Sequence, residues 1–233
     1  MLLPSHAIAD RRRELMTSIS ASLKYFADAT LQFERRAEQT MGMPATERRW
    51  WTRAEVLALM EAEPLHWPRY ELVDGELLVT PSPAGIHQLA VGEMLGELRD
   101  FAKRTGACQP LTSPSDVELE PGTLVQPDVY VISTAESIRL RQDGRAQELL
   151  LAIEVLSPGS GGHDRGRKRA LYQRTVPEYW IVDLDARLIE RWAPADTRPE
   201  IVRDQIDIVF SGSDQTFAFE LQPFFTFVFG DTK

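Results

Sequence analysis

The sequence contains only one cysteine, Cys108, which excludes an internal disulfide and leaves no cysteine pair for a zinc knuckle. No apolar stretch reaches the roughly 18 residues that a membrane-spanning helix needs. A Gly-x-Ser-x-Gly motif is also missing, and Cys108 has no indicated histidine partner, so a serine or cysteine hydrolase is not expected. These absences, with 43% hydrophobic and 26% charged residues, predict a cytoplasmic protein with one sizeable core.

The net charge of -9 works against nucleic-acid binding, because such binding relies largely on basic surfaces that contact phosphates. A local basic patch can still steer DNA while the rest of the surface stays acidic. Such a patch is indicated by the arginines of one predicted helix, namely Arg165, Arg167, Arg169 and Arg174. An ordinary charged helix face is the alternative.

Two carboxylates interrupt segments that otherwise read as buried β-strands. Asp128 lies within Leu124–Ile132, and Glu154 lies within Leu149–Leu156. Carboxylates are rarely buried unless they are paired or bind a metal. A turn role for Asp128 and a buried ion pair for Glu154 are the alternatives to a functional site.

A lysine follows at a helical spacing. After the Glu154 strand and a glycine-rich loop, the segment His163–Thr175 reads as a helix on which Asp164, Lys168 and Tyr172 recur every four residues. These three side chains therefore share one stripe, which begins one loop beyond the Glu154 strand. A solvated helix face is the alternative for the lysine.

A hairpin is predicted earlier in the chain. Two strand-like segments, Tyr70–Val73 and Glu76–Val79, flank the dipeptide Asp74-Gly75, which favours a type I′ turn. Glu71 lies in the first strand, either as a site residue or as an exposed cross-strand glutamate.

The remaining segments define the domain. A helix is expected over Ile86–Lys103, with His87 at its start as a cap, a solvent-facing residue or a phosphate contact. Phe224–Phe229 is expected to be a strand that is buried or lies at a subunit contact. Residues 1–45 stand apart as an N-terminal extension, and residues 46–233 form one domain in which strands alternate with helices, which is typical of an α/β sandwich.

Together these motifs resemble the PD-(D/E)XK nuclease superfamily, and most closely its Uma-type branch of restriction-endonuclease-like proteins. The resemblance runs from about Trp51 to about Trp192 and implies a restriction-endonuclease-like α/β sandwich with a central mixed β-sheet flanked by helices. The segments that carry it are Tyr70–Leu77, Pro81–Pro83 with His87, Gln126–Asp128, Glu154–Pro158, Asp164 with Lys168 and Tyr172, and Pro177–Asp183.

One position departs from the superfamily. The lysine expected two residues after the glutamate is Leu156 here, an apolar side chain that cannot stabilise charge. The Uma-type branch, which this chain resembles, also lacks a lysine at that position and has one on the following helix instead. Lys168 matches the lysine on that helix. A long lysine on an adjacent helix can bring its ammonium to the same place from another backbone origin.

The resemblance implies hydrolysis of a phosphodiester by a metal-activated water. Asp128, Glu154 and the Val155 carbonyl would bind Mg²⁺ or Mn²⁺, hard cations that prefer oxygen ligands. Lys168 would orient the water or stabilise the transition state. Glu71 is a further catalytic candidate.

DNA is the implied substrate, and a homodimer is the implied assembly. The expected nucleic-acid contacts are His87, Arg165, Arg169 and Tyr172. The alternative function is a catalytically inactive nuclease-fold protein that serves as a binding module or scaffold.

Overall fold

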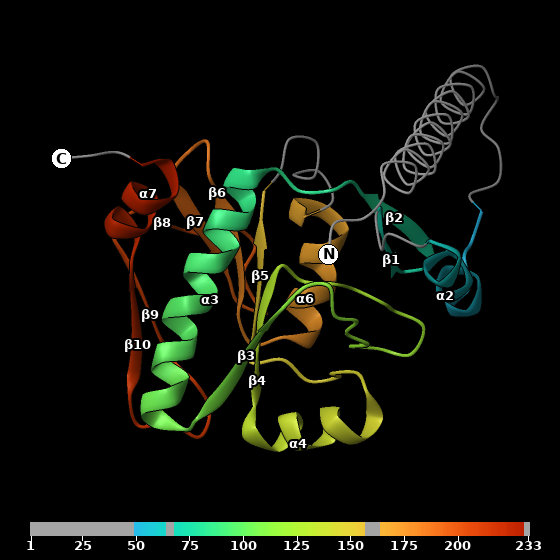
Figure 1. Cartoon of the computed structure of the whole chain (residues 1–233), viewed down its shortest axis with the longest axis horizontal. Coiled ribbons are helices and arrows are strands. Elements are labelled where there is room, and N and C mark those ends of the chain that lie inside the picture. Colours follow the sequence, from blue (N-terminus) through green and yellow to red (C-terminus); the bar gives the residue numbers. More distant parts are fainter. Residues whose placement is uncertain (1–48, 64–67, 157–163, 231–233) are drawn as a thin grey trace, which may run out of the picture. The chain divides into compact units, whose positions relative to one another are not determined.

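A computed structural model describes residues 49–63, 68–156 and 164–230. Its centre is a six-stranded mixed sheet in the order β3-β4-β5-β6-β7-β8, with helices on both faces (Figure 1). The predicted extension, residues 1–45, lies outside the described residues. The strands of the sheet are β3 (Cys108–Thr112), β4 (Val129–Ser133), β5 (Leu151–Val155), β6 (Tyr179–Asp183), β7 (Leu188–Trp192) and β8 (Glu200–Val202).

The centre of the sheet is buried on both faces. β5 and β6 pair in parallel, whereas the other neighbouring strands pair antiparallel. Every residue of β5 is buried, and such strands read as continuous hydrophobic runs. The connection between β5 and β6 contains a π-helical turn, η1 (Asp164–Lys168), that continues into α6 (Arg169–Thr175).

Alternation along β5 divides the core into two parts. Ile153 and Val155 join a core beneath α3 (Gly85–Thr105), whereas Ala152 joins a second core beneath α6. Figure 1 shows α3 on one side of the sheet and α6 on the other. Glu154 therefore lies on the α6 side, as its spacing predicts.

The first core is completed by elements at the end of the chain. These are the hairpin of β9 (Gln205–Val209) and β10 (Thr216–Glu220) and the helix α7 (Leu221–Phe229). The helix α4 (Thr134–Asp143) follows β4 directly. No helix within the described residues is both long and apolar enough to cross a membrane.

The prediction of a strand over Phe224–Phe229 is wrong, because this segment forms most of α7. Leu221, Phe224, Phe225 and Val228 are buried at helical i, i+3, i+4 and i+7 spacing. Phe227, which lies between the last two buried positions, is 52% exposed. The helical period was therefore present in the sequence, hidden by the density of phenylalanines.

The predicted strand Leu124–Ile132 is also too long, since β4 begins only at Val129. Pro127 has no N–H to donate to a ladder. Upstream of it, Leu124 and Val125 make only isolated bridges, to Leu72 and Val117. Asp128 thus lies one residue before a strand rather than within one.

The hairpin prediction is confirmed by β1 (Arg69–Val73) and β2 (Glu76–Thr80). Both turn residues, Asp74 and Gly75, have positive φ, as a type I′ turn requires. The preceding helix, α2 (Arg53–Ala62), begins with the capping box that Thr52 and Glu55 form. Leu72 and Leu124 exchange backbone hydrogen bonds, which fixes β1 beside the segment that leads to Asp128.

Candidate active site

Three carboxylates and one lysine converge beside the end of β5. Glu71 comes from β1, Asp128 from the residue before β4, Glu154 from β5 and Lys168 from η1, and none is more than 3% exposed. The ammonium of Lys168 lies 3.0 Å from Glu154 Oε1 and 2.8 Å from Glu71 Oε2. We call these residues, together with Asp164, the acid cluster.

Asp128 is held by three donors. Its Oδ1 accepts from Arg69 at 2.9 Å, and its Oδ2 lies 3.0 Å from His87 Nε2 and 3.0 Å from the backbone N–H of Val155. The β4–β5 register, which pairs Val129 with Ile153, brings Asp128 alongside Glu154. Burial alone would raise the pKa of Asp128, but His87, Arg69 and the Val155 N–H outweigh it and lower the pKa to about 2.

Glu71 is completely buried, which excludes an exposed cross-strand role. Its Oε1 accepts a hydrogen bond of 2.7 Å from the backbone N–H of Gln126. Its Oε2 is close enough to Lys168 for an ion pair, although the geometry falls outside that of a hydrogen bond. Glu71 therefore ties the Lys168 ammonium to the segment that precedes Asp128.

The predicted helical stripe is confirmed. Asp164, Lys168 and Tyr172 are all buried, and Lys168 Nζ lies 3.7 Å from Asp164 Oδ1. The Tyr172 hydroxyl donates to Glu154 Oε1 at 3.0 Å, the oxygen that Lys168 also contacts. Tyr179 packs its ring 4.6 Å from that of Tyr172 and donates to the Asp164 carbonyl. The second tyrosine was not singled out by the sequence.

The acid cluster brings together more acidic side chains than there are fixed cations to pair with them. Burial, with repulsion from the other acids, raises the pKa of Glu154 well above its usual value despite the attraction of Lys168. Burial would lower the pKa of Lys168, but three neighbouring acids outweigh it and raise the pKa, so the lysine stays charged. Four carboxylates thus face two fixed cations, Arg69 and Lys168; the acids are Glu71, Asp128, Glu154 and Asp164.

The donor chemistry of the acid cluster fits a hard divalent cation. Mg²⁺ usually takes one or two protein carboxylates and keeps several waters, and Asp128 and Glu154 with the Val155 carbonyl supply such oxygens. In the described part of the chain, no group of three or more His, Cys, Asp or Glu side chains is arranged to hold a metal. A site of two carboxylates and one carbonyl needs no such group. Binding of the cation would require Asp128 and Glu154 to give up ion pairs that they form with Arg69 and Lys168 in this structure.

Three of the four arginines of the basic helix are paired with acids, namely Arg165, Arg167 and Arg174. Arg165 contacts Asp183 and Glu190, each at 2.6 Å. Arg169 donates to Gln173 and lies over the ring of Trp192. Phosphate contact by these two arginines, as the sequence suggests, would compete with the partners they have in this structure.

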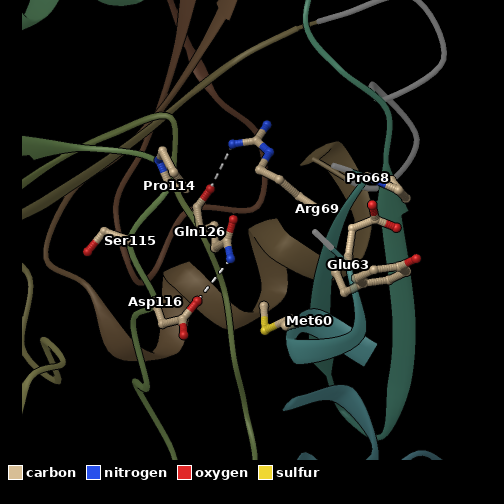
Figure 2. A pocket seen from close by; sticks show the side chains of 9 residues that line it. Met60, Glu63, Pro68, Arg69, Pro114, Ser115, Asp116 and Gln126 are labelled. Carbon is tan, nitrogen blue, oxygen red and sulfur yellow. Dashed lines mark hydrogen bonds between the residues drawn. The ribbon is translucent and has the colours of Figure 1, made fainter. Parts of the chain in front are cut away.

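A cavity of about 320 Å³ adjoins the acid cluster, and we call it the Gln126 pocket (Figure 2). Arg69 lines the pocket and also donates to Asp128 of the acid cluster, so this one side chain contacts both features. The other lining residues are Met60, Glu63, Pro68, Tyr70, Pro114, Ser115, Asp116 and Gln126.

Residues 56–219 match a family described as "Uma2: Putative restriction endonuclease". The chain belongs to the Uma2 family. This region contains every residue of the acid cluster, from Glu71 to Lys168. A crystal structure described as "a putative nuclease belonging to DUF820" from Anabaena variabilis is similar, with a TM-score of 0.61 and 15% identity over 74% of this chain and 98% of that one. At that identity the likeness shows the fold. No curated protein matches the sequence.

Sequence reasoning missed Arg69 and did not place His87 beside Asp128. Arg69 is 5% exposed and reaches Asp128 across 59 residues of chain, and nothing in its neighbourhood distinguishes it from an ordinary strand residue. His87 was singled out for phosphate or solvent, yet it is buried and contacts Asp128. Both contacts depend on long-range packing.

The depressed pKa of Asp128 predicts acid-sensitive stability. A carboxyl whose pKa is lower in the folded than in the unfolded state stabilises the fold at pH values above its unfolded-state pKa, which is 3.8 for aspartate. This stabilisation is lost as the pH falls toward the folded-state pKa of about 2. Between those values the free energy of unfolding should fall by about 2 kcal/mol more in the native protein than in Asp128→Asn. Urea unfolding at several pH values measures this. The exposed Asp100→Asn serves as control and should keep the native slope.

Proposed function

We propose that this protein is a Mg²⁺- or Mn²⁺-dependent DNA endonuclease that hydrolyses phosphodiester bonds at the acid cluster. One observation carries the proposal: buried acidic side chains from separate segments of the chain meet one lysine and outnumber the fixed cations around them, in a member of a family described as "Putative restriction endonuclease". Buried charge of one sign is costly unless it is paired or binds a metal. A site for a hard cation explains why the excess is present.

The ligands of the ion would be Asp128, Glu154 and the carbonyl of Val155. When bound, the ion supplies Lewis-acid stabilisation of charge on the phosphate and a more acidic water. Arg69 and His87 hold Asp128, and Tyr172 holds Glu154, so both carboxylates have fixed orientations. Groups that orient metal ligands in this way tune affinity.

Lys168 would act on the reacting phosphate. Its ammonium pairs with Glu154 and Glu71. The ammonium can turn toward an anionic substrate once another cation balances the charge of Glu154. There it would orient the attacking water or offset the charge that develops on the phosphoryl oxygens. Glu71 would retain the ammonium close to that position.

The proposal extends to substrate and assembly. The family resemblance supports DNA as the substrate, a homodimer as the assembly and the cytoplasm as the location. Arg165 and Arg169 are the proposed contacts to nucleic acid, and each would exchange its present partners for phosphates. His87 and Tyr172, which the sequence also suggested for this role, are buried against Asp128 and Glu154, so their proposed role is to hold those carboxylates.

Plasmid cleavage tests the proposed activity. The native protein should nick or linearise supercoiled DNA in Mg²⁺ or Mn²⁺ and should be inactive in EDTA. Asp128→Asn should lose cleavage, whereas Asp100→Asn, an exposed change on α3, should retain it. Cleavage that persists in EDTA, or in Asp128→Asn at the native rate, would refute the assignment.

A second candidate function is a nuclease-fold binding module without chemistry. It is favoured by Leu156, which stands where the superfamily has its lysine, and by the three donors that already occupy both oxygens of Asp128. Such a module has no reason to bind a divalent ion in the acid cluster.

Thermal unfolding separates the two candidates. A ligand that binds only the folded state stabilises it by about 2.7 kcal/mol at one hundred times its dissociation constant. Millimolar Mg²⁺ or Mn²⁺ should therefore raise the unfolding temperature of the native protein. The shift should vanish in Asp128→Asn and persist in Asp100→Asn. No shift in the native protein would favour the inactive module.

A further inference from the structure

The Gln126 pocket contains a buried acceptor that lacks a partner. Gln126 is 6% exposed, and within the described residues its side-chain Oε1 accepts no hydrogen bond. Its Nε2 donates to Asp116 Oδ1 at 2.9 Å, which fixes the orientation of the amide (Figure 2). A buried acceptor without a donor costs free energy. The pocket therefore suits a ligand that presents an N–H or O–H group to Gln126.

The walls of the Gln126 pocket suit a flat ring. Met60, Pro68 and Pro114 provide apolar surface, and Tyr70 provides an aromatic ring. Small-molecule sites usually measure about 300–1,000 Å³, so this cavity of about 320 Å³ is near the lower limit. It can hold one nucleoside-sized group but not stacked base pairs.

The backbone of Gln126 connects the pocket to the acid cluster. Its N–H donates to Glu71, and its carbonyl accepts from Arg69 at 3.3 Å. The same guanidinium group of Arg69 contacts Asp128 at 2.9 Å. A ring in the pocket would therefore lie beside the residues proposed to hold the ion, and the phosphate attached to it would lie close to them.

We propose that the Gln126 pocket binds a single unstacked nucleobase of the strand that is cut. This inference rests on the proposed function and specifies its substrate as single-stranded or locally unpaired DNA, since a base inside a duplex cannot enter. The pocket presents acceptors, Gln126 Oε1 and the Asp116 carboxylate, so it selects bases by their N–H donors. Guanine, with its N1–H beside its amino group, complements them best, and thymine, with one N–H, does so least.

Calorimetric titration of the full chain with 2′-deoxyguanosine in EDTA tests the proposal. The nucleoside is chosen because it lacks the phosphate that the acids would repel. We expect saturable binding that Gln126→Leu weakens about tenfold or more through loss of the acceptor. Thymidine should bind more weakly than 2′-deoxyguanosine. The matched control is Gln109→Leu on β3, whose amide donates to the Pro110 carbonyl, and it should bind like the native protein.

Absence of binding by the native protein, or equal binding by Gln126→Leu, would overturn the proposal. If Gln126→Leu does not fold, Tyr70→Leu replaces it, and loss of base stacking should weaken binding about tenfold. The outcome is independent of cleavage because EDTA removes metal. Cleavage without nucleoside binding would refute the pocket alone, whereas nucleoside binding without cleavage would refute the proposed chemistry alone.

Discussion

Lys168→Met is expected to abolish DNA cleavage while leaving divalent-metal binding intact. The substitution removes the ammonium that would act on the phosphate, and loss of one such stabilising group costs roughly 10²–10³-fold in rate. It does not remove Asp128 or Glu154, the proposed ligands. Metal affinity should stay or rise, because Lys168 and a cation compete for the same carboxylates. Single-turnover cleavage and calorimetric Mn²⁺ titration measure the two effects separately.

The same substitution should lower the free energy of unfolding. Glu71 and Glu154 would lose a buried countercharge, and breaking one side of a buried ion pair costs about 3–5 kcal/mol. The double variant Lys168→Met/Glu154→Gln should be more stable than Lys168→Met, since both charges of one pair are removed together. Lys103→Met, at a lysine that is 76% exposed, should leave stability and cleavage almost unchanged. Cleavage by Lys168→Met at the native rate would contradict the role of this lysine.

Glu154→Gln is expected to lose both metal binding and cleavage without losing stability. The variant keeps the shape of the side chain but removes a proposed ligand. Because burial and the neighbouring acids raise the pKa of Glu154, the charged form is unfavourable in the folded state, and an amide resembles the neutral form. The largest functional loss should thus accompany little or no destabilisation.

The raised pKa of Glu154 also predicts that stability falls as pH rises. A carboxyl whose pKa is raised on folding stabilises the fold fully below its unfolded value of 4.5, and this stabilisation is lost as pH rises toward the folded pKa. The free energy of unfolding of the native protein should therefore decline above pH 4.5 more steeply than that of Glu154→Gln. Glu97→Gln, an exposed change on α3, should follow the native curve. Parallel curves for the native protein and Glu154→Gln would contradict the excess of charge in the acid cluster.

Much of the fold could be predicted because local patterns and tertiary structure agree. The turn at Asp74-Gly75 follows from that dipeptide, and the stripe of Asp164, Lys168 and Tyr172 follows from their spacing. The last helix, Leu221–Phe229, was predicted to contain a strand because its six-residue segment rich in phenylalanine fits both the strand period and the helical period only imperfectly. Burial of four of its side chains against α3 and the sheet decides in favour of the helix.

The acid cluster could be predicted only in part. Glu154 and Lys168 stand out because a charge interrupts an apolar run or recurs at helical spacing. The contacts of Arg69 and His87 to Asp128 cannot be recognised in the sequence, because each joins residues more than 40 positions apart. The same limit applies to the arginines: Arg165 has a local signature of a basic patch, yet acids on β6 and β7 pair with it.

The central claim is that the buried acids form a site for a divalent cation. Anomalous diffraction from crystals grown with Mn²⁺ tests it most directly. The account predicts a manganese peak bonded to Asp128 and Glu154, with the Lys168 ammonium displaced from Glu154. Crystals of Glu154→Gln should lack the peak. A native crystal without manganese in the acid cluster, in which Lys168 still pairs with Glu154 and Arg69 with Asp128, would contradict the account.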